Sequence, residues 1–155
     1  MKPGANHPLW RCPSCGRRFR RTLQPHACGL GSRAALLRGK PPALAKLYQT
    51  LERDLSRWGP HETFARGRYA LFRTTRGFAD LVFMREGLCL ALYLGTRTEA
   101  PCFFKVIRVS SHRIIHVAML RGPADWRSVR PFLKKAYLFA RQDESPHRKL
   151  RKAPG

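Results

Sequence analysis

Residues 88–94 read Leu-Cys-Leu-Ala-Leu-Tyr-Leu, and this strict alternation is the clearest structural signal in the chain. Successive side chains of a β-strand point to opposite faces, so the leucines of this stretch share one face and bury it together. Glu86-Gly87, immediately before it, is a turn sequence of the kind that joins two antiparallel strands. We therefore predict a strand at 88–94 that turns a leucine face toward the core of an antiparallel sheet.

Alternating patterns on both sides of this stretch predict four more strands. They cover residues 68–74, 78–84, 103–109 and 113–120. The connections between them are short, and short connections join antiparallel neighbours. We therefore expect a mostly antiparallel five-stranded sheet.

Two helices flank the predicted strands in the sequence. Pro41-Pro42 begins the first, because proline suits a first helical turn, and Gly59-Pro60 ends it. The second spans residues 124–141 and contains Pro131, where we expect a kink or a restart. Apolar residues recur at spacings of three and four in both segments, which indicates one buried stripe on each helix. The predicted fold class is therefore α+β, with the sheet flanked by an N-terminal and a C-terminal helix.

A cluster of metal-ligand residue types lies ahead of this domain. Cys12, Cys15, His26 and Cys28 fall within seventeen residues, as Cys-Pro-Ser-Cys-Gly followed later by His-Ala-Cys. Three thiolates and one imidazole are a ligand set typical of structural Zn²⁺, and four protein ligands leave no open position for a reacting water. A redox Cys-x-x-Cys would need a thioredoxin-like surrounding, and five cysteines are an odd number for disulfides. We therefore predict a structural zinc site as the cofactor of a small N-terminal module.

Trp10 and Phe19 flank the first cysteine pair. On a small hairpin, the two rings would close over the metal as a miniature core. The chain is expected to divide into a flexible lead at 1–8, the zinc-binding module at 9–30, a linker at 31–40, the α+β domain at 41–141 and a disordered basic tail at 142–155.

The charge of the chain indicates a polyanionic partner. It carries 31 Lys and Arg against 9 Asp and Glu, a formal net charge of +22. Arg and Lys that neutralise phosphates drive binding to nucleic acid, so DNA or RNA is the expected partner, while a solvated basic surface without a ligand is the alternative. No run of eighteen apolar residues and no apolar leader is found in the sequence, so we expect no membrane contact and a reducing, cytoplasmic location.

Basic residues with aromatic neighbours mark the expected nucleic-acid contacts. Four of them lie beside the cysteine cluster, and the others lie on the predicted strands or at their ends. The predicted contacts are Arg17, Arg18, Arg20, Arg21, Arg68, Arg73, Arg76, Lys105 and Arg108.

The sequence favours a non-enzymatic protein. The acidic residues are scattered, whereas metal-dependent phosphoryl chemistry needs clustered carboxylates, and neither a phosphate-binding glycine loop nor a nucleophile elbow occurs. Two other interpretations stay open. One is an adaptor whose zinc module or sheet edge docks an acidic protein partner. The other is a small-anion-binding or hydrolytic domain with a pocket where Arg73, Arg76, His116 or Tyr137 converge.

Several short motifs of the larger domain occur in a familiar order. They are Lys40-Pro41-Pro42, Leu47-Tyr48, Trp58-Gly59-Pro60, Tyr69–Phe72, Arg76–Ala79, Leu88–Leu94, His116 and Ala136-Tyr137. Together they resemble an uncharacterised bacterial domain-of-unknown-function family sometimes labelled "predicted transport protein". Some members carry a similar Cys-Pro-x-Cys-Gly zinc-ribbon-like module in front. The resemblance implies an α+β domain and no catalytic residues, and no segment here is apolar enough to support the transport label.

Overall fold

The computed structural model describes residues 9–13, 18–24 and 33–142. The chain divides into a small N-terminal unit, residues 1–31, and a larger unit, residues 32–155. In the small unit, β1 (Trp10–Arg11) pairs with β2 (Arg18–Phe19) in an antiparallel two-stranded hairpin. The predicted flexible lead at 1–8 lies outside the described residues, as does the predicted tail apart from Gln142.

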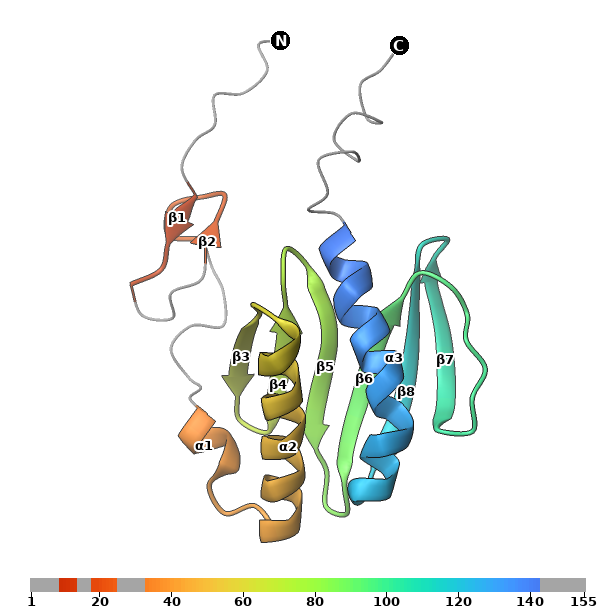
Figure 1. Ribbon diagram of the computed structural model, residues 1–155. Helices are drawn as coiled ribbons and strands as arrows, with labels where there is room; N and C mark the ends of the chain where they lie inside the picture. The colour runs from red at the N-terminus through yellow and green to blue at the C-terminus, as the bar shows by residue number, and fades with distance from the viewer. Residues whose placement is uncertain (1–8, 14–17, 25–32, 143–155) are drawn as a thin grey trace. The chain divides into compact units, whose positions relative to one another are not determined.

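The larger unit is an α+β fold with one six-stranded sheet. Its strand order is β3-β4-β5-β6-β8-β7, and every neighbouring pair is antiparallel (Figure 1). The elements are α1 (Arg33–Leu37), α2 (Pro42–Trp58), β3 (Glu62–Arg66), β4 (Tyr69–Arg73), β5 (Gly77–Phe83), β6 (Leu88–Leu94), β7 (Phe103–Ser110), β8 (Arg113–Leu120) and α3 (Pro123–Arg141).

The alternating leucine strand lies in the middle of the sheet, as its pattern predicts. β6 pairs with β5 on one side and with β8 on the other. Its four leucines are buried, while Cys89, Ala91 and Tyr93 on the opposite face are half-buried. A strand with neighbours on both sides and a helix layer over one face has the lowest exposure in a two-layer fold.

The prediction of five strands is wrong, because β3 adds a sixth at the edge. β3 and β4 form a hairpin in which Arg66 pairs with Tyr69, so only Gly67 and Arg68 connect them. Gly67 has a φ of +57°, which suits so tight a connection. β3 buries none of its five residues, so its sequence lacks the apolar alternation that identified the other strands. Its strand conformation depends on pairing with β4.

Both long helices cover the same face of the sheet (Figure 1). α2 ends before Gly59, and α3 continues as one helix through Pro131, so the predicted restart does not occur. Proline removes the backbone bond to the residue four positions earlier, here Arg127. Both Pro131 and Arg127 are exposed, so water can satisfy the carbonyl that loses its donor.

The short helix α1 lies within the segment that the sequence predicts as a linker. Its Leu36 is fully buried in the core of the larger unit. Arg33 at its start donates to both carboxylate oxygens of Glu52 on α2, at 2.8 and 3.1 Å. This ion pair, in which one Nε–H is shared between the two oxygens, and the buried leucine attach α1 to the α+β unit.

A chain of aromatic contacts connects the helices to the sheet. Tyr48 of α2 lies 6.4 Å from Phe72, Phe72 lies 6.4 Å from Phe78, and Phe78 meets Tyr137 of α3 edge-on at 5.4 Å between ring centroids. Rings at these separations add stabilisation beyond the area that they bury. Burial raises the pKa of Tyr48, with the Glu52 carboxylate adding to the shift.

Candidate functional site

The N-terminal hairpin brings its two aromatic residues together. Trp10 pairs with Phe19 across the strands, and their ring centroids are 6.0 Å apart. Cys12 directly follows β1 and is 4% exposed, so the first predicted zinc ligand is buried where the hairpin loop begins. The other three predicted ligands, Cys15, His26 and Cys28, lie outside the described residues. A buried cysteine at the start of a Cys-Pro-Ser-Cys-Gly loop fits the zinc site, which stays a prediction.

The predicted nucleic-acid contacts of this hairpin are exposed. Arg18 lies on β2, and Arg20 and Arg21 follow it, while Arg17 lies outside the described residues. The described basic side chains are therefore accessible to a polyanion.

The predicted contacts of the larger unit do not form one surface. Arg68 lies in the β3–β4 turn, and Arg73 donates to the carbonyl of Thr75 at 3.1 Å on the sheet face away from the helices. Lys105 pairs with Val117, which lies on the sheet face away from the helices. Arg108 pairs with Ile114, which lies on the helix-covered face, so Lys105 and Arg108 point to opposite sides of β7. Only Arg76 of the predicted set lines the pocket described below.

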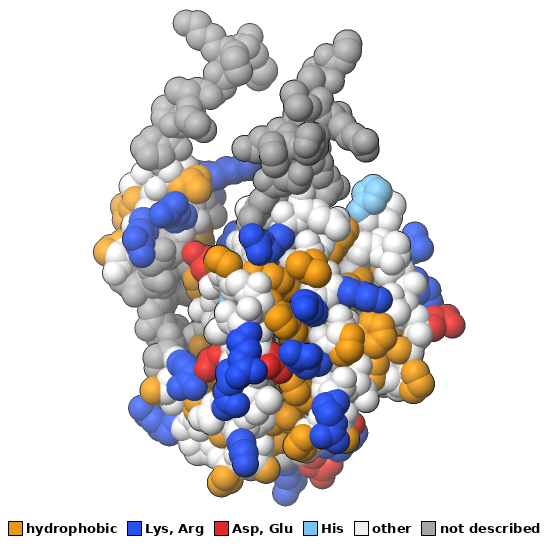
Figure 2. Space-filling view, viewed as in Figure 1, with side chains coloured by type: hydrophobic (Ala, Val, Ile, Leu, Met, Phe, Trp, Pro, Cys, Tyr) orange, Lys and Arg blue, Asp and Glu red, His pale blue; other side chains and the backbone are white. Residues whose placement is uncertain are grey.

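A basic surface that the sequence reasoning missed lies on the two helices. Figure 2 shows Lys and Arg side chains spread over this face with few acidic ones between them. The exposed members of this helix-face set are Lys46, Arg53, Arg57, Arg127, Arg130, Lys134, Lys135 and Arg141. The sequence pattern that could have revealed this surface is the basic residues opposite the apolar stripe of each helix. The same pattern also occurs on an ordinary solvated helix face.

The carboxylates of the larger unit are largely engaged in internal contacts. Glu52 binds Arg33, and Asp54 accepts from Trp126 at 3.0 Å and from Arg130 at 2.9 Å. Asp80, Asp125 and Glu99 also have partners: the hydroxyl of Tyr93, the backbone N–H of Arg121 and the guanidinium of Arg97. Glu52, Asp54 and Glu99 pair with neighbouring cations, whereas Asp80 and Asp125 accept from neutral donors, so few carboxylates lie beside the helix-face set.

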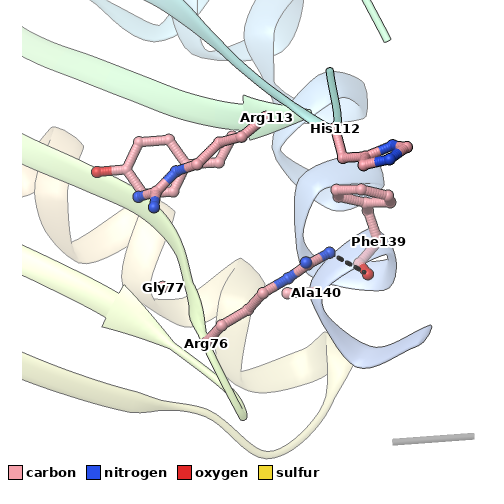
Figure 3. A pocket seen from close by; sticks show the side chains of 7 residues that line it. Arg76, Gly77, His112, Arg113, Phe139 and Ala140 are labelled. Carbon is pink, nitrogen blue, oxygen red and sulfur yellow. Dashed lines mark hydrogen bonds between the residues drawn. The ribbon is translucent and has the colours of Figure 1, made fainter. Parts of the chain in front are cut away.

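A small pocket opens where β5 and β8 begin, β6 ends and α3 reaches its last turn (Figure 3). Its volume is about 110 Å³. The residues that line it are Arg76, Gly77, Tyr93, His112, Arg113, Phe139 and Ala140. Two permanent cations and one imidazole ring therefore line the pocket, and no carboxylate belongs to this lining.

Aromatic rings hold both guanidinium groups of the pocket. The guanidinium carbon of Arg76 lies 4.4 Å from the centroid of Phe139, and that of Arg113 lies 4.4 Å from the centroid of Tyr93. Arg76 also donates from Nη2 to the carbonyl of Phe139 at 3.1 Å, and His112 points toward the Phe139 ring (Figure 3). Stacking fixes the plane of an arginine fork, so less side-chain freedom is lost when it binds an anion.

Two groups of negative potential lie near the pocket, the carbonyls at the end of α3 and the carboxylate of Asp80, and both accept hydrogen bonds from other residues. The carbonyls of the last turn of α3 accept from Arg76 and from the hydroxyl of Thr75, which reduces the negative potential of a helix C-terminus. Asp80 accepts a hydrogen bond from Tyr93 and does not line the pocket. Burial raises the pKa of Asp80 above its usual value, whereas Tyr93 and Arg113 lower it. Burial and Asp80 raise the pKa of Tyr93, so its hydroxyl keeps its proton as a donor.

His116 and Tyr137 have structural contacts elsewhere. His116 is fully buried, accepts from the backbone N–H of Thr98 at Nε2 (2.9 Å), and carries Nδ1 3.2 Å from the carbonyl of Ile114. The proton therefore belongs on Nδ1, where it can donate to that carbonyl. Tyr137 donates to the carbonyl of Pro60 at 3.2 Å. Neither residue lines the pocket with Arg76, so the predicted convergence of these side chains is not found.

Among residues 9–13, 18–24 and 33–142, no three His, Cys, Asp or Glu side chains group closely enough to hold a metal ion. No helix in those same segments combines the length and the apolar character needed to span a bilayer. The described residues form a basic surface on the two helices and a small pocket lined by Arg76 and Arg113, and both carry groups that can bind phosphate-like anions.

The comparison with protein families found a match to the larger unit. A family model with the description "Domain of unknown function (DUF5655)" matches residues 34–140. The match contains all the residues that line the pocket. It contains none of the cysteine cluster, which precedes it in the sequence. No curated protein matches the chain, and no solved structure matches it. Because the match covers well over half of the sequence, the chain belongs to the DUF5655 family.

Proposed function

We propose that this chain is a non-enzymatic zinc protein that binds nucleic acid mainly through the phosphate backbone. The observation that carries the proposal is the excess of exposed basic over acidic side chains on the two helices. The chain has a net charge of +22, and five of its carboxylates are occupied by internal partners: Glu52, Asp54, Asp80, Glu99 and Asp125. A polyanion relieves the resulting self-repulsion and releases its own counterions on binding.

The distribution of the charges favours backbone contacts over base readout. The helix-face set occupies the exposed sides of two packed helices, and the hairpin adds Arg18, Arg20 and Arg21. The structure describes no long basic helix that projects alone from the larger unit, as a major-groove reader would. The helix-face set by itself suits many phosphates in succession, with little discrimination between sequences.

The zinc ion has a structural part in this proposal. Cys12, Cys15, His26 and Cys28 would hold it, and as four protein ligands they would complete a tetrahedral site. Metal binding would fold the segment around the Trp10–Phe19 pair and present its arginines from a defined backbone.

A salt titration with the full chain tests the proposal. Fluorescence anisotropy with single- and double-stranded oligonucleotides of the same sequence gives the dissociation constant between about 50 and 200 mM salt, a range over which six to ten phosphate contacts change affinity ~10³–10⁵-fold. We expect a steep linear decrease of the logarithm of affinity with the logarithm of salt concentration. Absence of any complex at the lowest ionic strength would overturn the proposal.

A further inference from the structure

The pocket at the end of β6 has a charge and size that suit one phosphate group. Arg76 and Arg113 supply two permanent positive charges, and His112 supplies a third group that can donate. The volume of about 110 Å³ is far below the ~300–1,000 Å³ typical of pockets for drug-sized ligands. A recess of this size holds several water-sized groups, the scale of a tetrahedral oxyanion.

The positions of the two arginines indicate preorganisation for such an anion. Each guanidinium is stacked on a ring at 4.4 Å, one on Phe139 and one on Tyr93, and the two rings come from different elements, α3 and β6. Figure 3 shows the two guanidinium groups in different parts of the recess and directed at different partners, so an anion held there would meet donors whose planes are already set. Planar guanidinium groups bind phosphate oxygens in pairs, which a single flexible lysine cannot do.

The phosphate group at the end of a nucleic-acid strand differs chemically from the phosphate groups inside the strand. An internal phosphodiester carries one negative charge, two free oxygens and a sugar on each side. A terminal phosphomonoester carries about −1.5 to −2 at neutral pH and three free oxygens, and a chain continues from it on one side only. A recess of about 110 Å³ lined by two stacked arginines and a histidine suits the second group better, because its donors match a group with more charge and more free oxygens.

We propose that the Arg76–Arg113 pocket binds the terminal phosphate of a nucleic-acid strand. This inference rests on the proposed function and adds a preference for phosphorylated strand ends to the general backbone binding. In the described part of the chain, the lining residues come from the β4–β5 turn, β5, β6, the β7–β8 turn, β8 and α3, so only the folded α+β unit assembles the site.

The test compares oligonucleotides that differ only at their ends. Full-length protein is titrated, at one salt concentration, with 5′-phosphorylated, 3′-phosphorylated and unphosphorylated single strands of one sequence, and inorganic phosphate is added as a competitor. We expect a phosphorylated end to bind about tenfold more tightly, a difference within the range of one or two charge-assisted hydrogen bonds. Inorganic phosphate should remove this difference and leave the rest of the binding in place.

Variants at Arg113 and Arg85 test whether the preference for phosphorylated ends comes from the pocket. Arg113 is exposed, so Arg113→Gln should fold, and it should bind all three strands equally, whereas Arg113→Lys should keep part of the preference. Arg85→Gln is the matched control, because it removes the same charge from an exposed position in the β5–β6 turn, at the other end of β6. Circular dichroism and thermal melting confirm the fold of each variant.

The outcomes separate this inference from the general function. Salt-dependent binding with equal affinity for all three ends, or an end preference that Arg113→Gln leaves intact, overturns the terminal-phosphate site and leaves backbone binding in place. Failure of every strand to bind at low salt overturns both. A preference that disappears in Arg113→Gln and persists in Arg85→Gln supports the site.

Discussion

The indole Nε1 of Trp126 donates to Oδ2 of Asp54 at 3.0 Å and so joins α3 to α2 through a buried carboxylate. Arg130 donates to the same oxygen at 2.9 Å, and Arg57 approaches the other at 4.0 Å. Asp54 is 8% exposed, so these donors replace the water that the carboxylate loses on folding.

Asp54→Ala should destabilise the larger unit by about 2–4 kcal/mol, because it leaves the Trp126 N–H and the Arg130 charge without their buried acceptor. Urea denaturation monitored by circular dichroism measures the change. Glu62→Ala, on an exposed edge-strand position, serves as the control and should stay within about 0.5 kcal/mol of the original chain. Equal effects of the two substitutions would contradict the role of Asp54.

Gly59→Ala should also destabilise the fold, by about 2–4 kcal/mol, through strain and overpacking. Gly59 has a φ of +145°, and a Cβ at this position would lie 2.4 Å from the hydroxyl of Tyr137. Gly67→Ala is the matched control, since Gly67 also has a positive φ but no atom within 4 Å of an added Cβ. It should cost about 1 kcal/mol, the usual penalty of the left-handed region. Similar losses for both variants in thermal or urea unfolding would rule out the contact with Tyr137.

His116 should make stability depend on pH. Burial lowers its pKa in the folded chain below the ordinary value of 6.5, and the Arg97 charge adds to this, against the raising effect of the Ile114 carbonyl. The other groups that face the ring, the Thr98 N–H and the Phe103 side chain, do not titrate. Below pH 6.5 the unfolded chain therefore takes up a proton that the folded chain refuses, so the free energy of unfolding decreases as pH falls toward the folded-state pKa.

The His116→Leu variant isolates this contribution. It should be less stable at pH 7.5, because the Thr98 N–H loses its acceptor, but it should lose less stability than the original chain between pH 7.5 and 5. Urea denaturation at several pH values measures both effects. Asp80, whose pKa is raised, contributes equally to both proteins, so identical pH profiles would count against His116 as the source.

Removing charge from α3 should reduce the salt dependence of nucleic-acid binding. Arg127 and Lys134 are exposed and seven residues apart, so they share one side of the helix. The double variant Arg127→Gln/Lys134→Gln should flatten the logarithmic salt slope for duplex DNA by up to ~1.8, at about 0.9 per lost phosphate contact. The control Arg85→Gln/Arg121→Gln removes the same net charge near the β5–β6 turn, and an equal change there would show that only overall charge matters.

Removal of the metal should affect the N-terminal unit and spare the larger one. Elemental analysis of the purified chain should find one zinc per molecule, and Cys12→Ser should reduce this amount sharply, because it replaces a buried ligand. Chelation should weaken oligonucleotide binding while the urea unfolding of the larger unit stays the same. Cys89→Ser, on a half-buried sheet position, is the control and should retain full zinc content.

Strong local patterns predicted the strands well. β6 and β8 have the predicted bounds, and β4, β5 and β7 differ only at their ends, because alternating apolar side chains determine which face is buried. β3 was missed because an edge strand without buried residues carries no such pattern. Of the kink or restart expected at Pro131, the restart does not occur, because Pro131 lies on the exposed side of α3, where water can satisfy the carbonyl that loses its donor.

The site residues were harder to predict. Arg76 was identified as a basic residue near a strand end, but its pocket partners Tyr93, Arg113 and Phe139 lie 17, 37 and 63 positions further along the chain. Nothing local in the sequence connects them. The sequence analysis did not single out the helix-face set, because a basic residue opposite an apolar stripe has the same appearance in a binding surface and in an ordinary solvated face.

The sequence by itself determined the α+β class, the two long helices, five of the strands and the strongly basic character, because each follows from side-chain periodicity or composition within a short window. Only the tertiary structure decided the sixth strand, the internal partners of the carboxylates and the meeting of Arg76 and Arg113 in one pocket. Those features depend on which strands lie side by side and on which face receives the helices. Such long-range packing is fixed by the free energy of the whole core and leaves no signature in neighbouring residues.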